Sequence, residues 1–439
     1  MGGSRYSNSD LKITKLGLES GSRLALKGSI LLLVRGSTLH NRIPVGIAVR
    51  DVAFNQDVKA IRVKPELAAR QVTDEMYLYY WLKANEKKLL EMVEHTGIGA
   101  GKLDTKRLQD LEIRLPSWSE QRQIVASATA IDEKEILNSC INQTLEQMAQ
   151  AIFKSWFVDF EPVKAKIAAL EAGGSEEDAL LAAMQAISAK DEIELARLQA
   201  EQPEQYAELR ATAELFPSAL QESELGEIPE GWEVYPILEV CDLLGGAQPP
   251  ASTFSDEERP GYVRLLQIRD FTNDNHLTFV PDSKKLRKVS EDEVLIGRYG
   301  SASGNKEKDS LGRICRGKSG AYNVALMKLS PQKAGIEFCV QLFSSHDFYH
   351  YLRGTSTKAV QSGFSKKELK QYQVCLPSVG LREKYEALGQ LIWSQQKRLT
   401  KQSKSLEQTR DTLLPKLLSG ELSLTGAEQQ LEATEPVNV

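Results

Sequence analysis

One stretch of the chain matches the spacing of a nucleotide-binding phosphate loop. Residues 312–319 read Gly-Arg-Ile-Cys-Arg-Gly-Lys-Ser, which is a literal G-x4-G-K-[ST] pattern. In such a loop the backbone N–H groups hold phosphates, and this geometry needs an apolar strand before the loop and a helix after it. Here the polar segment 306–310 precedes the match, and 322–329 has the pattern of a strand. The hypothesis that the protein is an ATP-hydrolysing enzyme rests on this match alone, and we rank it below the two hypotheses developed below.

The rest of the sequence offers no arrangement for catalysis. The Gly-rich stretch 97–102 has the wrong spacing for a phosphate loop, and neither a G-x-G-x-x-G fingerprint nor an Asp/Asn-Pro-Pro-aromatic tetrad occurs. The five His and five Cys lack the paired spacing of metal ligands, and scattered cysteines in odd number suit buried thiols in a reducing cytoplasm. No window holds the roughly 18 uninterrupted apolar residues of a membrane span. We expect a cytoplasmic protein that is not an enzyme and binds neither metal nor membrane.

Charge is distributed unevenly along the chain. The net charge is −5, but residues 171–233 hold 16 acidic and 3 basic side chains, a net of −13. The tail 421–439 adds four Glu and no Lys or Arg. Without these two segments the rest of the chain carries +12. An acidic insertion on a basic body is compatible with a polyanionic partner.

A segment of 50 residues occurs twice. Residues 103–152 align without a gap on 364–413 at a constant offset of 261, and Leu-Pro-Ser at 115–117 falls on Leu-Pro-Ser at 376–378. Both copies then keep a seven-residue spacing over five positions, which indicates a long helix with a narrow apolar seam against another helix. The seam positions are Ile124, Ile131, Asn138, Leu145 and Ile152 in the first copy, and Tyr385, Ile392, Leu399, Leu406 and Leu413 in the second.

The helix starts can be placed from local signals. Pro116-Ser117 and Pro377-Ser378 precede the two helices, and Ser117 with Glu120 has the pattern of a capping box. From there each helix can run some 41 residues, or about 60 Å. The first ends in an aromatic cluster of Phe153, Trp156, Phe157 and Phe160, which is either core of the helix pair or a surface for a partner.

Short strands and turns precede each long helix. Residues 28–37 align on 292–301 at an offset of 264, although the first copy has about 35 fewer residues ahead of this segment than the second. Apolar runs predict strands at 29–34, 45–49 and 111–115 and a helix at 76–94, while Asp104 and Ser365 cap short helices. The sequence thus predicts an α/β (α+β) fold class with two similar domains and two long helices. The predicted segments are a first domain (1–116, short at its N-terminus), the first long helix (117–160), an acidic helical insertion and linker (161–229), a second domain (230–377), the second long helix (378–420) and an acidic disordered tail (421–439).

Several motifs resemble one known family. They are Leu115-Pro-Ser followed by Glu120-Gln-Arg, the run Phe-Lys-Ser-Trp-Phe-Val-Asp-Phe at 153–160, Leu-Phe-Pro at 215–217, Glu-Ser-Glu-Leu-Gly-Glu-Ile-Pro-Glu-Gly-Trp at 222–232, Leu-Ile-Gly-Arg-Tyr-Gly-Ser at 295–301 and Leu-Leu-Pro-Lys-Leu-Leu-Ser-Gly-Glu-Leu at 413–422. Together with the duplication, they are similar to the specificity subunits of type I restriction–modification enzymes. The resemblance covers nearly the whole chain.

This resemblance implies a set of expectations about fold and function. Two target-recognition domains would each read one half of a split site in double-stranded DNA. The two long helices would form an antiparallel coiled-coil pair that spaces the domains and docks two methyltransferase (modification) subunits, and restriction/translocase subunits would join them. A specificity subunit of this kind is an adaptor without cofactors of its own, because S-adenosylmethionine, ATP and Mg belong to the partner subunits.

Basic and polar side chains then become candidate DNA contacts. Lys and Arg give salt-dependent affinity for phosphates, and Arg also reads guanine edges. The candidates in the second domain are Arg298, Tyr299, Asn305, Lys306, Lys308, Arg313, Arg316, Lys318 and Gln361, and those in the first are Arg35, Arg42, Arg50 and Lys59. For each of them the alternative is a solvated surface charge. The alternative for the whole protein is a coiled-coil scaffold or adaptor of a truncated or orphan system, without sequence-specific DNA reading.

Overall fold

The computed structural model divides into two compact units. It describes residues 5–6, 12–96, 99–274, 276–300, 306, 309–355 and 363–422. Unit 1 consists of Met1–Cys140 with Leu399–Val439, and unit 2 consists of Ile141–Arg398. Strands and helices mix in both units, which confirms the predicted fold class. Within the described residues, no helix combines the length and the apolar character that crossing a membrane requires.

The two long helices form where the duplicated segment predicts them. Helix α6 spans Trp118–Phe157 and helix α15 spans Val379–Ser419. Ser117 and Glu120 make the capping box, because the Ser117 backbone N–H donates to Glu120 Oε2 (2.9 Å) and the Glu120 N–H donates to Ser117 Oγ (3.3 Å). These bonds satisfy backbone donors that the first helical turn leaves open.

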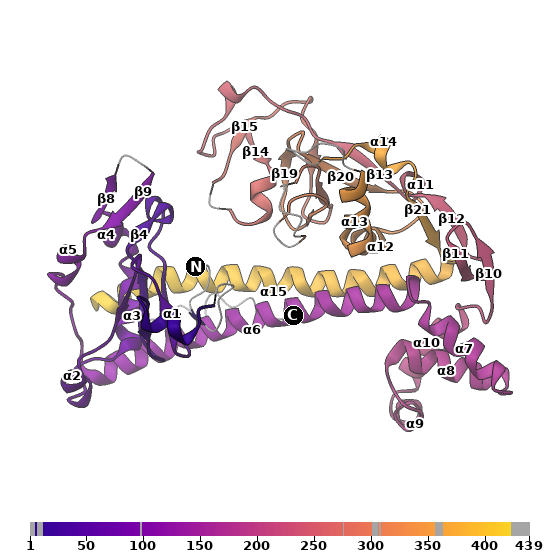
Figure 1. Ribbon diagram of the computed structural model, residues 1–439, viewed down its shortest axis with the longest axis horizontal. Coiled ribbons are helices and arrows are strands. Elements are labelled where there is room, and N and C mark those ends of the chain that lie inside the picture. Colours follow the sequence, from indigo (N-terminus) through magenta and orange to yellow (C-terminus); the bar gives the residue numbers. More distant parts are fainter. Residues whose placement is uncertain are drawn as a thin grey trace. The chain divides into compact units, whose positions relative to one another are not determined.

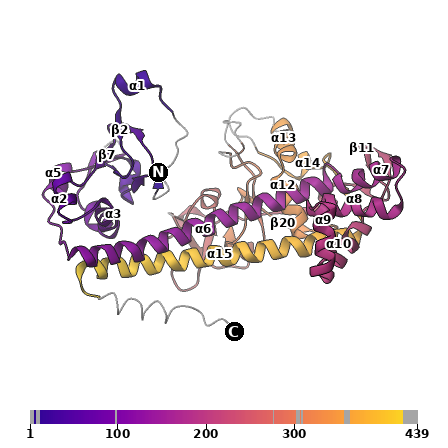
Figure 2. The same cartoon turned by 90° about the horizontal axis from the view of Figure 1, so that it is seen from below.

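Each unit contains its own stretch of contact between α6 and α15. In unit 1, Ile124 shares a buried cluster with Leu413, and in unit 2 the rings of Phe153 and Tyr385 lie 6.0 Å apart. Higher residue numbers in α6 meet lower numbers in α15 in both units, so the helices run antiparallel (Figures 1 and 2). The seam positions are buried at Ile124, Asn138, Tyr385, Leu399 and Leu413 and half-buried at Ile131, Leu145, Ile152, Ile392 and Leu406.

Asn138 is the polar member of the seam. Its side chain is 0% exposed, and its Nδ2 donates to Gln402 Oε1 at 3.0 Å and to Ser403 Oγ at 3.1 Å. Sliding α15 by one heptad would replace these acceptors with other side chains and leave a buried amide unpaired. A single polar residue in an apolar seam specifies the register of two helices in this way, at a cost in stability.

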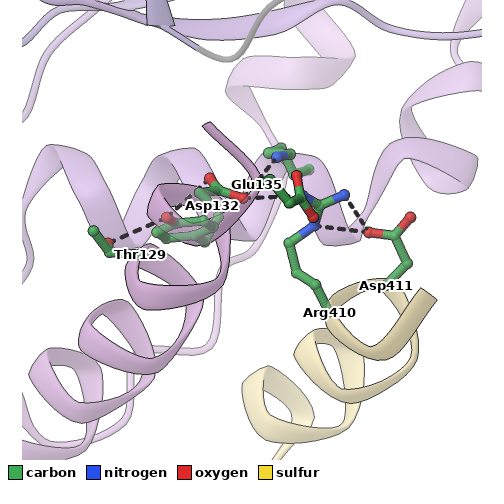
Figure 3. A network of polar contacts seen from close by, with 7 residues as sticks. Thr129, Asp132, Glu135, Arg410 and Asp411 are labelled. Carbon is green, nitrogen blue, oxygen red and sulfur yellow. Dashed lines mark hydrogen bonds and ion pairs between the residues drawn. The ribbon is translucent and has the colours of Figure 1, made fainter. Parts of the chain in front are cut away.

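A buried group of charges joins the same helices in unit 1 (Figure 3). Arg410 on α15 is 7% exposed, and its Nη1 donates to Asp132 (2.9 Å) and Glu135 (3.1 Å) on α6. Asp411 accepts a further bond from Arg410 at 2.9 Å. Burial acts against the charge on Arg410, but the three carboxylates raise its pKa. Burial also raises the pKa of Glu135. The arginine is therefore held as a cation by its partners.

The charge group also anchors helix α3 (Glu75–Ala84) to the helix pair. The Tyr80 hydroxyl donates to Asp132 Oδ2 at 3.1 Å, and Lys83 Nζ lies 3.8 Å from the same carboxylate. Burial raises the pKa of Tyr80 and lowers that of Lys83. Asp132 thus receives hydrogen bonds or charge from two helices, α3 and α15, at one point.

The strands of unit 1 form three small sheets with the orders β1-β5-β3-β7, β2-β6 and β4-β9-β8. Among the described strands of this unit, the β1–β5 pair is the parallel one. The strands are β1 (Arg5–Tyr6), β2 (Arg23–Ala25), β3 (Ile30–Leu33), β4 (Arg35–Gly36), β5 (Val45–Ala48), β6 (Val52–Phe54), β7 (Val58–Ile61), β8 (Val93–Thr96) and β9 (Ala100–Leu103). The short helices are α1 (Lys15–Glu19), η1 (Ser37–His40), α2 (Pro65–Ala69), α4 (Glu86–Leu90) and α5 (Thr105–Gln109). The apolar faces of β3 and α3 pack on the ends of α6 and α15 in one buried cluster.

In unit 2, the acidic insertion that follows α6 is a helical bundle with its own small core (Figures 1 and 2). Its helices are α7 (Glu161–Glu171), α8 (Glu176–Ser188), α9 (Glu192–Glu201) and α10 (Pro203–Glu214). The aromatic cluster at the end of α6 is core rather than partner surface. Phe153, Trp156 and Phe157 are 4–6% exposed and pack against Phe338 and Tyr385.

The strands of unit 2 lie in four sheets, β10-β11, β12-β21, β13-β20-β17-β18 and β15-β14-β19-β16. They are β10 (Leu220–Ser223), β11 (Gly226–Pro229), β12 (Glu233–Pro236), β13 (Cys241–Gly245), β14 (Tyr262–Leu266), β15 (Phe279–Pro281), β16 (Lys288–Val289), β17 (Leu295–Gly297), β18 (Ile314–Cys315), β19 (Gly320–Tyr322), β20 (Leu326–Pro331) and β21 (Gln373–Leu376). The remaining helices are α11 (Ile237–Val240), η2 (Ala251–Thr253), η3 (Ile268–Phe271), α12 (Ile336–Ser344), α13 (His346–Thr355) and α14 (Lys366–Leu369).

The two units repeat the same elements in the same pairing. With the sequence offset of 264 residues, strand β3 aligns with β17 and strand β2 aligns with β16. With the offset of 261 residues, helix α3 aligns with α12 and helix α5 aligns with α14. Strand β3 lies between β5 and β7, as β17 lies between β18 and β20. The duplication seen in the sequence therefore extends beyond the long helices to the strand pairings of the two domains.

Two predictions of secondary structure were wrong. The helix expected over 76–94 breaks at Asn85, whose side-chain Nδ2 donates to the Trp81 carbonyl at 2.9 Å and so competes with the helical backbone. The strand expected over 111–115 does not form. Its counterpart β21 in unit 2 is a strand because it pairs with β12. Segment 111–115 has no such partner among the described residues of unit 1.

Replacing Arg410 tests the buried charge group. Arg410→Ala should lower the free energy of unfolding by about 3 kcal/mol, because it leaves Asp132 buried without its main partner. Lys404→Ala, at an exposed position of the same helix, is the control and should change it by less than about 0.5 kcal/mol. Urea denaturation measures the free energy of unfolding of both variants. Equal effects of the two substitutions would contradict the role given to Arg410.

Candidate nucleic-acid interface

A row of polar positions lies across the small sheet of unit 1. Arg35 on β4 is directly opposite Lys102 on β9, and Lys102 is opposite Glu94 on β8. All three side chains are exposed. Two cations directly across a strand pair repel each other, and Glu94 offsets only one of them. The row therefore presents a net positive charge that an anion such as a DNA phosphate would relieve.

Gly101 allows this row to lie close to the body of unit 1. A Cβ at Gly101 would come within 2.9 Å of both Leu39 and Val93 side chains. Nearby, His40 forms a hydrogen bond with the Gly99 carbonyl at 3.1 Å. The spacing of the Gly-rich stretch 97–102 gave it no function, so its Lys102 is a candidate contact that sequence reasoning missed.

Unit 2 repeats this row with different side chains. Tyr299 forms an isolated antiparallel β-bridge with Gly363. The offset of 264 places Tyr299 on Arg35, and the offset of 261 places Gly363 on Lys102. A Cβ at Gly363 would lie 2.6 Å from the Tyr299 ring, so only glycine fits there. Arg298 lies over that ring at 5.1 Å from its centroid and donates from Nε to the Phe364 carbonyl at 2.9 Å. A tyrosine with a fixed arginine at this position suits stacking and hydrogen bonding rather than pure charge.

Arg316 has a structural partner instead of a free guanidinium. Its side chain is 10% exposed and donates from Nη1 to both carboxylate oxygens of Glu337 at 3.0 Å. Its guanidinium also lies 4.1 Å from the centroid of the Trp393 ring on α15. Burial raises the pKa of Glu337, although Arg316 acts in the opposite direction. The side chain thus joins strand β18 to α12 and α15, and this geometry argues against a DNA contact.

Lys318 and Lys306 are also engaged within the protein. Lys318 Nζ donates to Asp274 Oδ1 at 2.7 Å, and Arg264 binds the same carboxylate. Burial acts to raise the pKa of Asp274, but these two cations hold it below its usual range. Lys306 donates to the Ser344 carbonyl, and burial lowers its pKa. Both lysines are therefore poorer candidates for phosphate contacts than the exposed ones.

The remaining candidates differ in exposure. Arg50 and Lys59 are exposed on unit 1, while Arg42 and Arg313 are half-buried and border cavities of about 670 and 370 Å³. Asn305, Lys308 and Gln361 lie outside the described residues. The structure thus brings Arg298 and Tyr299 together with Gly363, whereas Arg316 and Lys318 are held by carboxylates elsewhere in unit 2.

A basic run between β15 and β16 escaped the sequence prediction. Residues 284–288 read Lys-Lys-Leu-Arg-Lys, and their four basic side chains are exposed. Lys288 pairs with Asp282 at 2.7 Å. The signal that could have found this run is its charge density, four basic residues in five. Exposed basic runs of this kind are typical of contacts with nucleic acid.

The phosphate-loop match has the wrong surroundings in the structure as well. The segment 312–319 contains strand β18, and strand β19 follows it directly, where a phosphate loop needs a helix. In the described part of the chain, no group of three His, Cys, Asp or Glu side chains is placed to hold a metal ion.

Comparison with known proteins identifies the family. A family model described as "Type I restriction modification DNA specificity domain" matches residues 2–147. The type I restriction enzyme HindI specificity subunit of Haemophilus influenzae is 30% identical over 371 residues, which cover 79% of this chain and 77% of that protein. The chain belongs to the specificity subunits of type I restriction enzymes. The MjaIX specificity subunit of Methanocaldococcus jannaschii is a further relative, 23% identical over 92% of this chain and 80% of its own.

A solved structure of a type I specificity subunit from M. genitalium also aligns with the chain. The alignment covers 90% of this chain and 83% of the M. genitalium chain, with 16% sequence identity and a TM-score of 0.43. In the present chain, the motifs at 115–122 and 153–160 that suggested the family lie at the start of α6 and at its aromatic end.

The position of Arg316 in this specificity subunit leads to a stability prediction. Arg316→Ala should lower the free energy of unfolding by about 3 kcal/mol, because Glu337 stays buried without a partner. The double variant Arg316→Met/Glu337→Leu should restore most of this stability. Arg259→Ala, an exposed arginine of the same unit, is the control. A stable Arg316→Ala variant whose DNA binding became less sensitive to salt would instead assign Arg316 to the DNA interface.

Proposed function

We propose that this chain supplies the DNA sequence specificity of a type I restriction–modification complex. Each domain would read one half of a two-part site in double-stranded DNA. The observation that carries the proposal is the repeated row, Arg35–Lys102 in unit 1 and Tyr299–Gly363 in unit 2. The same backbone position holds different side chains in the two units, as expected if each copy reads its own sequence on a common scaffold.

The contacts divide into those that position DNA and those that read it. Exposed lysines such as Lys102, Lys284 and Lys285 would bind phosphates, which carry no sequence information directly. The Arg298–Tyr299 pair is suited to base edges, because a guanidinium held in place can donate two bonds to guanine, and Arg35 is exposed at the matching position of unit 1. If the protein were a coiled-coil scaffold that does not read DNA, neither the Arg35–Lys102 row nor the Tyr299–Gly363 row would have a function.

The long helices would hold the partner subunits. Large apolar side chains on α6 and α15 are exposed, with Leu391 at 71%, Val379 at 59% and Met148 at 49%. We propose that two methyltransferase subunits bind there and that restriction/translocase subunits join them, bringing S-adenosylmethionine, ATP and Mg with them.

The basic run in unit 2 gives a salt-dependence prediction. Lys284→Ala/Lys285→Ala should weaken binding of one half-site and flatten the slope of log K against log[salt] by about two, because each substitution removes one lysine–phosphate ion pair. Lys164→Ala/Arg197→Ala in the acidic bundle is the matched control and should leave the slope unchanged. Affinity and slope are measured in the complex with its methyltransferase. A control slope that changes as much as the test slope would contradict the assignment.

The helix pair should also set the distance between the half-sites. One heptad added to α6 and one to α15 keeps the seam in register and adds about 10 Å at roughly 1.5 Å per residue. DNA advances about 3.4 Å per base pair, so the preferred gap should grow by about three base pairs. Binding to DNAs with a series of gaps measures this. An unchanged gap, or a changed half-site sequence, would contradict the proposed spacing role.

A further inference from the structure

A short helix of unit 2 presents an arginine to solvent. Helix η3 (Ile268–Phe271) follows strand β14, and its Arg269 is exposed. In a 3₁₀ helix, side chains three residues apart lie on the same face. Ile268 and Phe271 have this spacing, and both pack on the buried cluster that contains Leu295 and Tyr322. Arg269 therefore lies on the face of η3 that points away from the core.

The Arg269 guanidinium is held in place although it is exposed. Its Nη2 donates to Thr278 Oγ1 at 2.7 Å, and Gln267 Nε2 donates to the same oxygen at 3.1 Å. Thr278 is 3% exposed and lies directly before strand β15, so this acceptor has a fixed position. Thr278 is the hydrogen-bond partner of Arg269 within the part of the chain that the structure describes. The remaining N–H groups of the guanidinium are thus available to a ligand, and little side-chain freedom is left to lose on binding.

Buried charges fix the segment that carries Arg269. Asp270 is 2% exposed, its Oδ2 accepts from the Gln267 backbone N–H at 2.6 Å, and its Oδ1 lies 3.6 Å from Arg264. Lys318 donates from Nζ to the Asp270 carbonyl and, at 2.7 Å, to Asp274 Oδ1. Lys318 is the lysine of the phosphate-loop match, and here it joins the segment after β14 to the chain before β19.

Arg269 lies near the row of unit 2 that contains Tyr299. A Cβ at Gly297 would be 3.6 Å from the Ile268 side chain, so η3 contacts the end of strand β17. Arg269 and Arg298 are the next residues along the chain from this contact. Each guanidinium donates one hydrogen bond to the protein, and for Arg298 the acceptor is the Phe364 carbonyl. Two neighbouring segments therefore carry two arginines that are held in the same manner.

A polar cavity of about 260 Å³ lies beside Arg269. It is lined by Arg269, Asp270, Thr272, Asn273 and His276, and none of these side chains is apolar. A base edge in the major groove presents several hydrogen-bond donors and acceptors, and guanine presents two acceptors, O6 and N7, which suit the paired donors of an arginine. The lining of the cavity thus suits the edge of a base better than an apolar ligand.

We propose that Arg269 reads a guanine in the half-site of unit 2, and that Thr278 and Lys318 are positioning residues for it. This inference rests on the proposed function and adds the residue that selects one base pair. The guanidinium donates two hydrogen bonds to O6 and N7 of the guanine. Lys318 holds residues 270–274 and does not itself contact DNA. The basic run 284–288, between two strands of the same domain, binds phosphates and contributes no base preference.

Discrimination at single base pairs tests the proposal. The half-site of unit 2 is the one that changes when residues 230–377 are exchanged for those of a relative. Binding is measured for the full chain with its methyltransferase, on DNAs in which each base pair of that half-site is changed in turn. Arg269→Ala should reduce the preference at one G·C pair by at least about fivefold and leave the other pairs and the unit 1 half-site unchanged. Arg269→Lys keeps the charge but not the planar pair of donors, so it should lose most of the same preference with an unchanged salt slope.

Variants of Thr278 and Lys318 test the positioning role. Thr278→Val removes the acceptor hydroxyl and nearly keeps the shape, so it should weaken the preference at the same G·C pair. Thr278→Ser keeps the hydroxyl and should retain the preference. Lys318→Met should weaken it as well, without changing the salt slope, because the Lys318 ammonium bonds the protein. A loss of base preference at other pairs in these variants would overturn the positioning role.

Two results for Arg269→Ala would overturn the proposal. Binding that weakens equally for all sequences, with a salt slope flatter by about one, would make Arg269 a phosphate contact. Unchanged preferences at every pair would give it no role, which is the result expected for the control Arg197→Ala, an exposed arginine of the acidic bundle. The wild-type complex separates this failure from that of the proposed function, since a wild-type complex without any base preference would contradict both.

Discussion

The antiparallel contact between α6 and α15 is the interaction on which both units depend. In unit 1 the seam supports β3 and α3 through Ile124 and Leu413, and in unit 2 it supports α12 through Phe153 and Tyr385. Apolar contact alone would allow the helices to slide by a heptad at little cost. Asn138, bonded to Gln402 and Ser403, and the buried charges around Arg410 make one register preferable, since any other leaves them unpaired.

The charged side chains of the protein serve two different purposes. Arg316 is half-buried and Arg410 is buried, and both are paired with carboxylates and joined to the long helices. They therefore fix the geometry of each domain on its helix segment. Arg35 and Lys102 are exposed, and Glu94 is the acidic member of their row. A protein that reads DNA needs both kinds, because contacts to bases require rigid placement as well as charge. The structural charges can be told from the DNA-binding charges by their burial and their ion-pair partners, whereas sequence composition does not distinguish them.

Local patterns predicted much of the fold. The seven-residue spacing, the caps at Ser117, Asp104 and Ser365 and the apolar run of β3 are each set by neighbours in the sequence, and the structure contains all of them. Segment 111–115 failed as a strand because a strand is defined by a partner, and in unit 2 that partner comes from 233–236. The helix expected over 76–94 failed because one side chain, Asn85, bonds the backbone.

The candidate site was harder to predict for a related reason. Arg316 and Lys318 are predicted DNA contacts within a basic, Gly-rich segment, and in the structure Glu337 and Asp274 approach them from elsewhere in the chain. Whether a basic side chain is free depends on such distant partners, which no local pattern encodes. Lys102 was overlooked for the opposite reason, because only strand pairing places it beside Arg35.

The central claim is that two similar domains of one chain each read half of a DNA target. Mapping of methylated bases in DNA from cells that make this chain with its methyltransferase tests it most directly. The account predicts one two-part sequence with a fixed gap, and exchange of residues 230–377 for those of a relative should change one half and leave the other half and the gap unchanged. Methylation without a two-part sequence, or an exchange that alters both halves, would contradict the account.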